Sequence, residues 1–378
     1  MSSVTAAKPT CDPKAFEYLV SNEVKARLLR SDPYTAAMAF VRGQFDVEGD
    51  PVEAVRYQLQ QARDGWRPAF MKVVRRLIPW RIMQRLRTRE GVAEDIRFHY
   101  DRSNEFYRIF LDERMVYTCA YYRNPNDSLA QAQWNKLDHI CRKLILRPEE
   151  RFLDIGSGWG GLIIHAAQKF GAMATGCTLS RRQAEFALER RDREGLQSRV
   201  SVLERDYRDM TGVYDKISSV GMFEAIGGAR LRGYFAKIHS LLRADGLFLN
   251  HGITRPVKGK RGSEGLFIAR HVFPGGEILT LPEVIAAAES AGFEVLDVEN
   301  LRRHYAITCR EWCQRIRDRR DECLSAVDEM TWRIWQLYLA GSSVAFDEGD
   351  LNLHQVLMSK CGANSAFPMT RDFLYRER

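Results

Sequence analysis

"RFLDIGSGWGGLIIHAAQKFG" (residues 151–171) is the stretch that decides the fold. It starts with a short apolar run typical of a buried strand, and it ends with apolar residues at helical spacing. Between the two lie Gly156, Gly158 and Gly160. Glycines at such a turn let the backbone approach a ligand closely, and the helix that follows begins with free N–H groups. The stretch therefore predicts a strand, a ligand-binding loop and a helix.

Strands and helices keep alternating after this stretch. Runs of strand character occur at 173–180, 199–206, 214–221, 246–254 and 294–301, and helical patterns separate most of them. This order predicts an α/β fold with a mainly parallel, doubly wound sheet that has helices on both faces. We expect a long helical stretch from about 309 to 340 and a final strand near 353–360. Upstream, we expect a helix over 129–146 and an edge hairpin over 40–51.

The glycine loop could serve a dinucleotide or another nucleoside ligand. Dinucleotide folds carry an acidic residue at the end of the second strand, where it binds the ribose. The corresponding residues here are "GCTLS" (176–180), which include no acid. An acid lies before the loop instead, at Asp154. This arrangement favours S-adenosylmethionine, which has no phosphate but carries an amino group and a sulfonium.

The length and composition suit a globular protein of two domains. The chain has 378 residues, of which 45% are hydrophobic and 28% charged. We expect a smaller domain over 1–90, associated with lipid or membrane, and a catalytic domain over 91–378, with helical cap elements at 91–146 and 255–279. No apolar run is long enough to span a bilayer, and the N-terminus lacks a secretory signal pattern. The eight cysteines show no zinc-binding spacing, so we expect no metal and a cytoplasmic location.

The net charge of +8 indicates an anionic partner. Residues 67–89 hold eight Lys and Arg, no acid, and apolar residues that include Trp80. Such a segment is typical of a helix that lies on an anionic membrane surface, although a solvated helix packed on its own domain has the same composition. Pro79 indicates two short helices here rather than one.

"VYTCAYY" (116–122) crowds three tyrosines around Cys119, one helix upstream of the glycine loop. By itself the pattern fits either a buried core segment or a lid over a bound cofactor.

From residue 91 onward the chain resembles the cyclopropane fatty acid synthases and the mycolic acid cyclopropane synthases. These are S-adenosylmethionine-dependent methyltransferases with a seven-stranded class I methyltransferase sheet whose last strand is antiparallel. The resemblance rests on nine blocks in family order. They are "FHYDRSNEFYRIFLDERMVYTCAYY", "LDIGSGWGGL", "GCTLSRRQ", "DYRDM", "VGMFEAIGG", "GLFLNHGIT", "FIARHVFPGG", "HYAITCREW" and "FPMTRDFLY".

The resemblance implies which residues bind S-adenosylmethionine. In the family, the segment that matches Tyr117 and Thr118 folds over the cofactor. The methionine part lies on Gly156 and Gly158, near Asp154. The ribose and adenine contacts carry over to Thr178, Leu179, Gln183, Asp206, Tyr207 and Arg208.

The family also binds a bicarbonate ion beside the transferred methyl group, and the resemblance implies the same here. The matching positions are Cys119, Glu224, His251, Tyr305 and the backbone near Ile253. The family reaction adds a methylene group to the double bond of an unsaturated phospholipid acyl chain, with bicarbonate as the base. Ala225 and Ser342 replace the family's usual His and Cys, which leaves a methyl or methylene branch open as the product.

Other functional classes share parts of this sequence pattern. A nucleic-acid amino methyltransferase would carry a proline motif after the fourth strand, and "SVGMFEAIGG" has none, so we expect no nucleic-acid partner. A small-molecule amine N-methyltransferase and a non-enzymatic lipid-binding protein share parts of the pattern. We expect a peripheral protein on the inner face of the membrane, and the sequence leaves a homodimer open.

Overall fold

The computed structural model describes residues 11–64, 104–258, 272, 277–363 and 367–375. The basic segment 67–89, the domain boundary at 90 and most of the predicted cap element 255–279 lie outside these ranges. Within them, no helix is both long and apolar enough to cross a bilayer.

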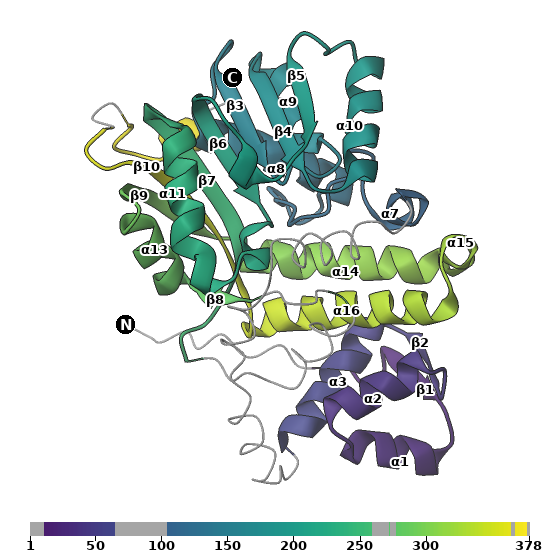
Figure 1. Cartoon of the computed structure of the whole chain (residues 1–378). Helices are drawn as coiled ribbons and strands as arrows, with labels where there is room; N and C mark the ends of the chain where they lie inside the picture. The colour runs from purple at the N-terminus through teal and green to yellow at the C-terminus, as the bar shows by residue number, and fades with distance from the viewer. Residues whose placement is uncertain (1–10, 65–103, 259–271, 273–276, 364–366, 376–378) are drawn as a thin grey trace.

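The centre of the molecule is a mostly parallel sheet in the order β5-β4-β3-β6-β7-β10-β9, with the short β8 paired to β7 (Figure 1). Only β10 runs antiparallel to its neighbours, β7 and β9. The strands are β3 (Arg151–Ile155), β4 (Met173–Thr178), β5 (Val200–Glu204), β6 (Tyr214–Val220), β7 (Leu242–Arg255), β8 (Leu279–Thr280), β9 (Phe293–Asn300) and β10 (Asn352–Lys360). This order and the single antiparallel last strand confirm the predicted class I methyltransferase fold.

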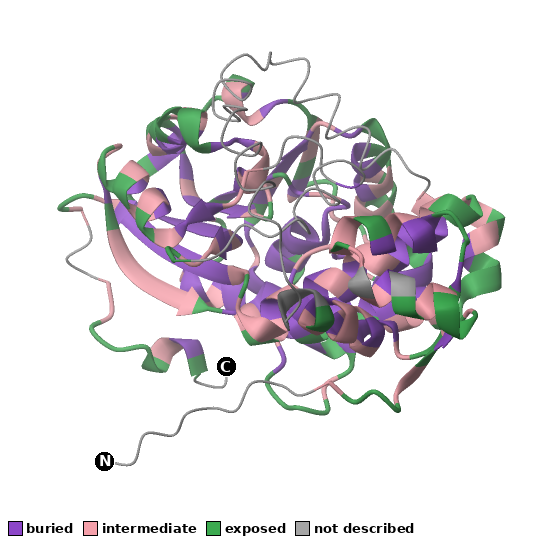
Figure 2. Cartoon of the chain, turned by 90° about the horizontal axis from the view of Figure 1, so that it is seen from below, coloured by how far each residue is buried: buried purple, intermediate pink, exposed green. Residues whose placement is uncertain are grey.

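Helices cover both faces of the sheet, and the strands between them are largely buried (Figure 2). On one face lie α8 (Leu129–Lys143) and α9 (Gly161–Phe170), and the short α17 (Asp372–Tyr375) packs on α8. On the other face lie α11 (Leu231–Leu241) and α13 (Leu281–Glu289). α10 (Arg181–Arg193) packs beside β4 and β5. The predicted helix over 129–146 is confirmed, ending at Lys143.

The predicted long helical stretch over 309–340 is confirmed, and it consists of three helices. These are α14 (Arg302–Asp318), α15 (Arg320–Ala326) and α16 (Glu329–Glu348). Asp328 is the N-cap residue of α16, because its carboxylate accepts a hydrogen bond from the Thr331 N–H at 2.7 Å. α14 and α16 pack against each other below the sheet, and α7 (Asn104–Phe110) packs on α14 (Figure 1). Aromatic residues of these helices form the largest core cluster with Tyr117 and Tyr305 at its margin.

The N-terminal unit consists of β1 (Phe16–Leu19), α1 (Asn22–Arg30), α2 (Pro33–Val41), β2 (Asp46–Gly49) and α3 (Pro51–Asp64). The predicted hairpin over 40–51 is wrong, because β2 pairs with β1 and the first residues of that range end α2. The unit packs on α16 through α3. Arg56, almost fully buried, pairs with Asp347 at 2.8 Å and Glu348 at 3.5 Å.

Candidate functional site

The glycine loop lies at the carboxyl end of β3, where ligands of open α/β sheets bind. Gly156, Gly158 and Gly160 all have positive φ angles, of 77°, 53° and 82°. A Cβ on Gly156 would lie 3.0 Å from Met222, and one on Gly160 would lie 2.9 Å from Ala187. A Cβ on Gly158 would meet no described atom within 4 Å. Gly156 and Gly160 are therefore required by packing, whereas Gly158 faces open space that a ligand could occupy.

Asp154 lies at the base of this loop, at the end of β3. It is buried, and it accepts a hydrogen bond of 2.6 Å from Ser218 on β6. Burial raises the pKa of Asp154 to about 7, although Ser218 and the charge of Lys136 lower it in part. A cationic group bound nearby would favour the ionised carboxylate, which fits the amino group of S-adenosylmethionine.

Lys136 on α8 is a site residue that the sequence analysis missed. Its ammonium is almost fully buried and donates to the Thr118 hydroxyl at 2.9 Å. Burial lowers the pKa of Lys136 to about 8, while Asp112, Cys119 and Asp154 raise it in part. A charged residue on the buried stripe with Leu137 and Ile140 was the available signal, since charged side chains are rarely buried without a partner.

The segment 116–122 lies across the carboxyl edge of the sheet. A Cβ on Gly221, after β6, would come within 3.0 Å of the Thr118 methyl group, so the two lie in contact. Gln133 holds the Thr118 carbonyl at 2.8 Å, and the Ala120 N–H donates to Thr308 at 3.1 Å. The structure thus places Thr118 against the loop after β6 and the neighbouring Val116 against Gly161 after β3, while the Cys119 thiol lies 3.8 Å from the Leu301 carbonyl oxygen after β9.

The predicted ribose contacts lie at the end of β4. The Thr178 hydroxyl donates to the Gln183 side chain at 2.7 Å and accepts the Ser180 N–H at 3.2 Å. Thr178 and Gln183 are buried, and Leu179 between them is half-buried. This places all three at the same strand end, where they could contact a nucleoside bound over the glycine loop.

The predicted adenine contacts follow β5. Asp206 is buried and begins the short 3-10 helix η1 (Tyr207–Asp209). Its carboxylate accepts hydrogen bonds from the Arg208 guanidinium at 2.9 and 2.5 Å and from the Arg208 N–H at 2.9 Å. Tyr207 packs edge-on against Tyr234. Because Arg208 occupies much of the Asp206 carboxylate, a ligand there would share it with Arg208.

Two of the predicted catalytic residues lie at neighbouring strand ends. Glu224 sits on the 3-10 helix η2 (Phe223–Ala225) after β6, and His251 lies near the end of β7. The Glu224 Oε1 atom accepts the Ile253 N–H at 2.6 Å. The Glu224 Oε2 and His251 Nε2 atoms are inaccessible to solvent and have no hydrogen-bond partner among the described residues. A ligand could therefore donate a hydrogen bond to Glu224 Oε2, and it could also bind the ring nitrogen Nε2 of His251.

Burial controls the protonation of this group. It raises the pKa of Glu224 to about 7, and it lowers the pKa of His251 well below its ordinary value. Burial also raises the pKa of the Cys119 thiol far above its ordinary value, so Cys119 is a neutral thiol at pH 7 and no thiolate nucleophile.

Tyr305 joins this group from α14. Its ring stacks on Phe346 of α16 with the ring centres 4.6 Å apart. Burial raises the pKa of Tyr305 well above its ordinary value, and the charges of Cys309, Tyr338, Cys119 and Glu224 raise it further. Tyr305 therefore lies within electrostatic range of Cys119 and Glu224.

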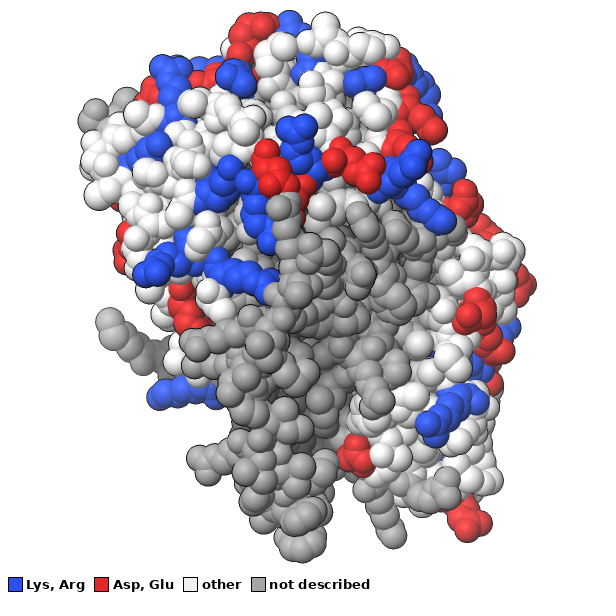
Figure 3. Space-filling view, in the orientation of Figure 1, with Lys and Arg blue, Asp and Glu red and all other residues white. Residues whose placement is uncertain are grey.

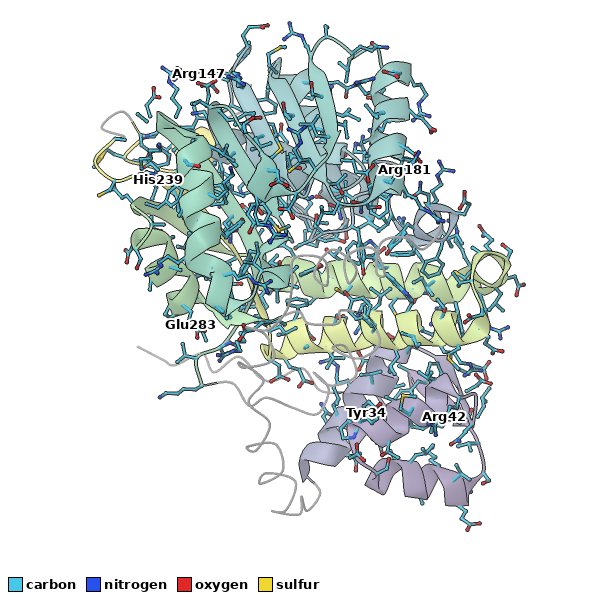
Figure 4. All side chains as sticks on the ribbon, viewed as in Figure 1. Tyr34, Arg42, Arg147, Arg181, His239 and Glu283 are labelled. Carbon is cyan, nitrogen blue, oxygen red and sulfur yellow. The ribbon has the colours of Figure 1, made fainter. Side chains whose placement is uncertain are left out.

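Figure 3 shows one face of the molecular surface, and Figure 4 shows the described side chains on the ribbon. Side chains fill the region between the sheet and α14, with Arg181 at the start of α10 on the periphery (Figure 4). The described surface in the view of Figure 3 mixes Lys and Arg with Asp and Glu. Among the described residues, no cluster of His, Cys, Asp and Glu has the geometry of a metal site.

The two residues that depart from the family pattern lie on different elements. Ser342 is buried within α16, and Ala225 is the last residue of η2.

Comparison with known proteins decides the family. The model of the mycolic acid cyclopropane synthetase family matches residues 87–356. This chain belongs to that family of S-adenosylmethionine-dependent methyltransferases. Over 346 residues it is 43% identical to a "Probable fatty acid methyltransferase" of Pseudomonas putida, covering 89% of this chain and 86% of the relative. It is 32% identical to cyclopropane mycolic acid synthase 3 of Mycobacterium tuberculosis, covering 70% and 96% of the two chains.

A solved structure supports the same assignment. A mycolic acid cyclopropane synthase complexed with SAH and CTAB matches with a TM-score of 0.69 and 30% identity, covering 73% of this chain and all of that chain. SAH is the product that S-adenosylmethionine leaves after methyl transfer, so this family member binds the cofactor that the glycine loop predicts. The family assignment confirms the resemblance.

Proposed function

We propose that this methyltransferase adds a methylene group to the double bond of unsaturated acyl chains in membrane phospholipids and closes a cyclopropane ring. The observation that carries the proposal is the placement of Cys119, Glu224, His251 and Tyr305 on segments at the carboxyl edge of the sheet, where Glu224 and His251 each have a buried polar atom without a hydrogen-bond partner among the described residues. Bound S-adenosylmethionine supplies an electrophilic methyl group. The residues described above on the loops after β3, β4 and β5 would hold it.

The residues around the reacting centre suit a neutral, apolar substrate. An alkene attacked by an electrophile becomes a cation, and the faces of aromatic rings stabilise cations. Tyr117 lies with its ring centre 5.1 Å from that of Trp312 and 5.8 Å from that of Trp335. Tyr305 and Phe346 add a second stacked pair. Their rings exclude water, which would otherwise trap such a cation.

Ring closure requires a base that removes a proton from the added methyl group. The partnerless atoms fit a bicarbonate ion, because Glu224 Oε2 can accept a hydrogen bond from its hydroxyl group and a protonated His251 Nε2 can donate one to its oxygen. Bound there, bicarbonate would supply the base. The Glu224 carboxylate is held by the Ile253 N–H, so its second oxygen is fixed in direction.

A methyl-branched fatty acyl product is the second candidate. The relative that is 43% identical bears the name of a fatty acid methyltransferase, and Ala225 and Ser342 depart from the pattern of the cyclopropane synthases. The first chemical step, methyl transfer to the alkene, would be the same. The two reactions would differ in how the resulting carbocation is neutralised. N-methylation of a small amine would use the same fold with a different acceptor.

The phospholipid substrate implies a membrane partner. We propose that the basic segment 67–89 binds the anionic inner surface of the membrane, consistent with the net charge of +8. The protein would then act as a peripheral cytoplasmic enzyme on acyl chains that it reaches from the membrane surface.

Mass spectrometry of lipids tests the proposed reaction. Cells that contain unsaturated phospholipids would express the wild type, His251→Asn as the inactive variant, and Cys361→Ser at an exposed position as the matched control. We expect the wild type and Cys361→Ser to add one methylene mass to unsaturated acyl chains, and the products to resist ozonolysis as a ring does. Ozonolysis-sensitive products would indicate a methylene branch, and an additional mass of two hydrogens would indicate a saturated methyl branch. Unchanged lipids with a methylated amine would refute the acyl substrate.

A further inference from the structure

Gln355 occupies a central position in the sheet, directly behind the proposed site. In the register of β10 it lies opposite His251 of β7 on one side and opposite Glu299 of β9 on the other. Residues that pair across strands project from the same face. His251, Gln355 and Glu299 therefore form one polar row across three strands.

Within the described part of the chain, the side chain of Gln355 makes one hydrogen bond, and that bond goes to His251. Its Nε2 atom lies 3.1 Å from His251 Nδ1, and both residues are at most 1% exposed. Gln355 Oε1 has no hydrogen-bond partner among the described residues. A buried amide with an unsatisfied oxygen is destabilising, so an apolar residue would stabilise this strand better. The amide group of Gln355 therefore lowers the stability of the strand, and its one hydrogen bond among the described residues is to His251.

In this geometry the amide nitrogen of Gln355, and not its oxygen, lies next to His251 Nδ1. Burial and the charges of Lys136 and Lys143 keep His251 neutral, so only one ring nitrogen carries hydrogen. An amide N–H can donate only to an unprotonated Nδ1, which leaves the proton on Nε2. We propose that Gln355 is a positioning residue that holds His251 as the Nε2–H tautomer, with this N–H available to an anion in the site.

The other charged groups that face His251 are already engaged. They come from α8 and β9: Lys136, Lys143, His139 and Glu299. Glu299 Oε2 accepts from Lys143 at 2.6 Å and from His139 at 2.8 Å, and among the described residues His251 Nε2 makes no hydrogen bond to Glu299. These two partners help to lower the pKa of Glu299 to about 2 in spite of its burial, so it stays ionised at neutral pH. Gln355 is thus the group that selects the tautomer.

This inference rests on the proposed ion site for its catalytic meaning. A bicarbonate oxygen needs a hydrogen-bond donor, and only the Nε2–H tautomer offers one from His251. The opposite tautomer would present a lone pair and repel the anion. The tautomer itself can be measured on the protein alone, independently of any reaction.

Gln355→Glu is the decisive variant because it keeps the shape of the side chain. A protonated carboxyl group at this position still donates to Nδ1, whereas an ionised one accepts from it and moves the imidazole proton there. We expect turnover of Gln355→Glu to fall about 10-fold or more as the pH rises through the ionisation of the new carboxyl group, beyond any change in the wild type. Gln355→Met, which cannot donate, should lose turnover to a similar extent at all pH values. Affinity for S-adenosylmethionine should change little in both.

NMR detection of the histidine ring nitrogens gives a readout that a merely structural role would not change. The His251 signals are identified by their absence in His251→Asn. In the wild type we expect Nε2 to have the chemical shift of a protonated, pyrrole-type nitrogen. In Gln355→Glu at high pH, Nδ1 should have that chemical shift instead. His354→Asn serves as the matched control, because His354 is the neighbouring residue on β10 and bonds Thr254 and Asn300 instead.

Three outcomes would overturn the inference. The first is a wild type with its proton on Nδ1, and the second is a tautomer that stays the same in Gln355→Glu at all pH values. The third is a shifted tautomer with unchanged turnover. If the wild type modifies no acyl lipid, the proposed function fails, and the NMR measurement on the free protein still decides which tautomer Gln355 selects.

Discussion

Replacing Glu224 with Gln should make the protein more stable at neutral pH and nearly inactive. The carboxylate is anchored by the Ile253 N–H at 2.6 Å, and its second oxygen is buried without a partner among the described residues. A glutamine has the same shape, and its amide oxygen can accept the same hydrogen bond. The variant should therefore fold normally; it loses a buried charge and places an amide NH2 group where the partnerless Oε2 atom was.

The magnitude follows from the pKa of Glu224. Burial raises this pKa from 4.5 to about 7, so the ionised carboxylate costs about 3 kcal/mol in the folded protein at about 1.4 kcal/mol per pKa unit. Below pH 4.5 the group is protonated in both the folded and unfolded states, and it contributes no cost. As the pH rises from there to about 7, the unfolded state loses this proton first, so wild-type stability falls. Above pH 7 the cost is fully present.

Urea unfolding followed by tryptophan fluorescence measures this effect at the two ends of the pH window. We expect the unfolding free energy of Glu224→Gln to exceed that of the wild type by up to about 3 kcal/mol above pH 7, and by little near pH 4.5. Glu289→Gln, at the exposed end of α13, is the matched control and should show no such pH-dependent difference. Equal stability of Glu224→Gln and the wild type across this window would refute the burial of a charged carboxylate.

Turnover completes the test. The variant loses the negative charge beside a cationic transition state, so we expect methyl transfer from labelled cofactor into phospholipid to fall on the order of 10²-fold. S-adenosylmethionine affinity, measured by calorimetry, should change little. Wild-type turnover in a folded Glu224→Gln variant would show that this carboxylate has no catalytic role.

Three further predictions follow from the cofactor loop and the basic segment. Gly158→Asp should abolish S-adenosylmethionine binding, because its side chain would enter the open space over the loop and its φ angle of 53° disfavours any residue with a Cβ; unchanged calorimetric affinity in a folded variant would contradict this. S-adenosylmethionine affinity should rise with pH through about 7 as Asp154 ionises, since its cationic group prefers a carboxylate, and Asp154→Asn should remove this rise. Reversing Arg75, Arg76 and Arg85 to Glu should weaken sedimentation with anionic vesicles, most at low salt, and equal sedimentation would count against membrane binding by this segment.

Much of the fold could be predicted from local patterns. Short apolar runs and helical spacing of apolar residues predict the alternation of strand and helix. Both patterns depend only on residues that are close in sequence. The wrong hairpin prediction over 40–51 and the undivided helical stretch over 309–340 both arose where a local signal was ambiguous. The breaks between α14, α15 and α16 carry no Gly or Pro, and the Asp328 cap was the only marker of the start of α16. The range 40–51 alternates in polarity, yet its first residues complete a helix whose buried face packs on neighbouring elements.

The sequence by itself determined the residue types and the strand ends at which they sit: the glycine loop after β3, Thr178 after β4, Glu224 after β6 and His251 on β7. Parallel strands bring their carboxyl ends to one edge, so the order of elements already implied that these groups share a site. Their protonation states and partners depend on residues distant in sequence. Lys136 on α8 and Gln355 on β10 carried weak local signals, since a lysine on a helix and a glutamine in a strand are usually solvated. Only the tertiary structure buries them against Thr118 and His251, because desolvation and hydrogen bonding act between groups that folding brings together.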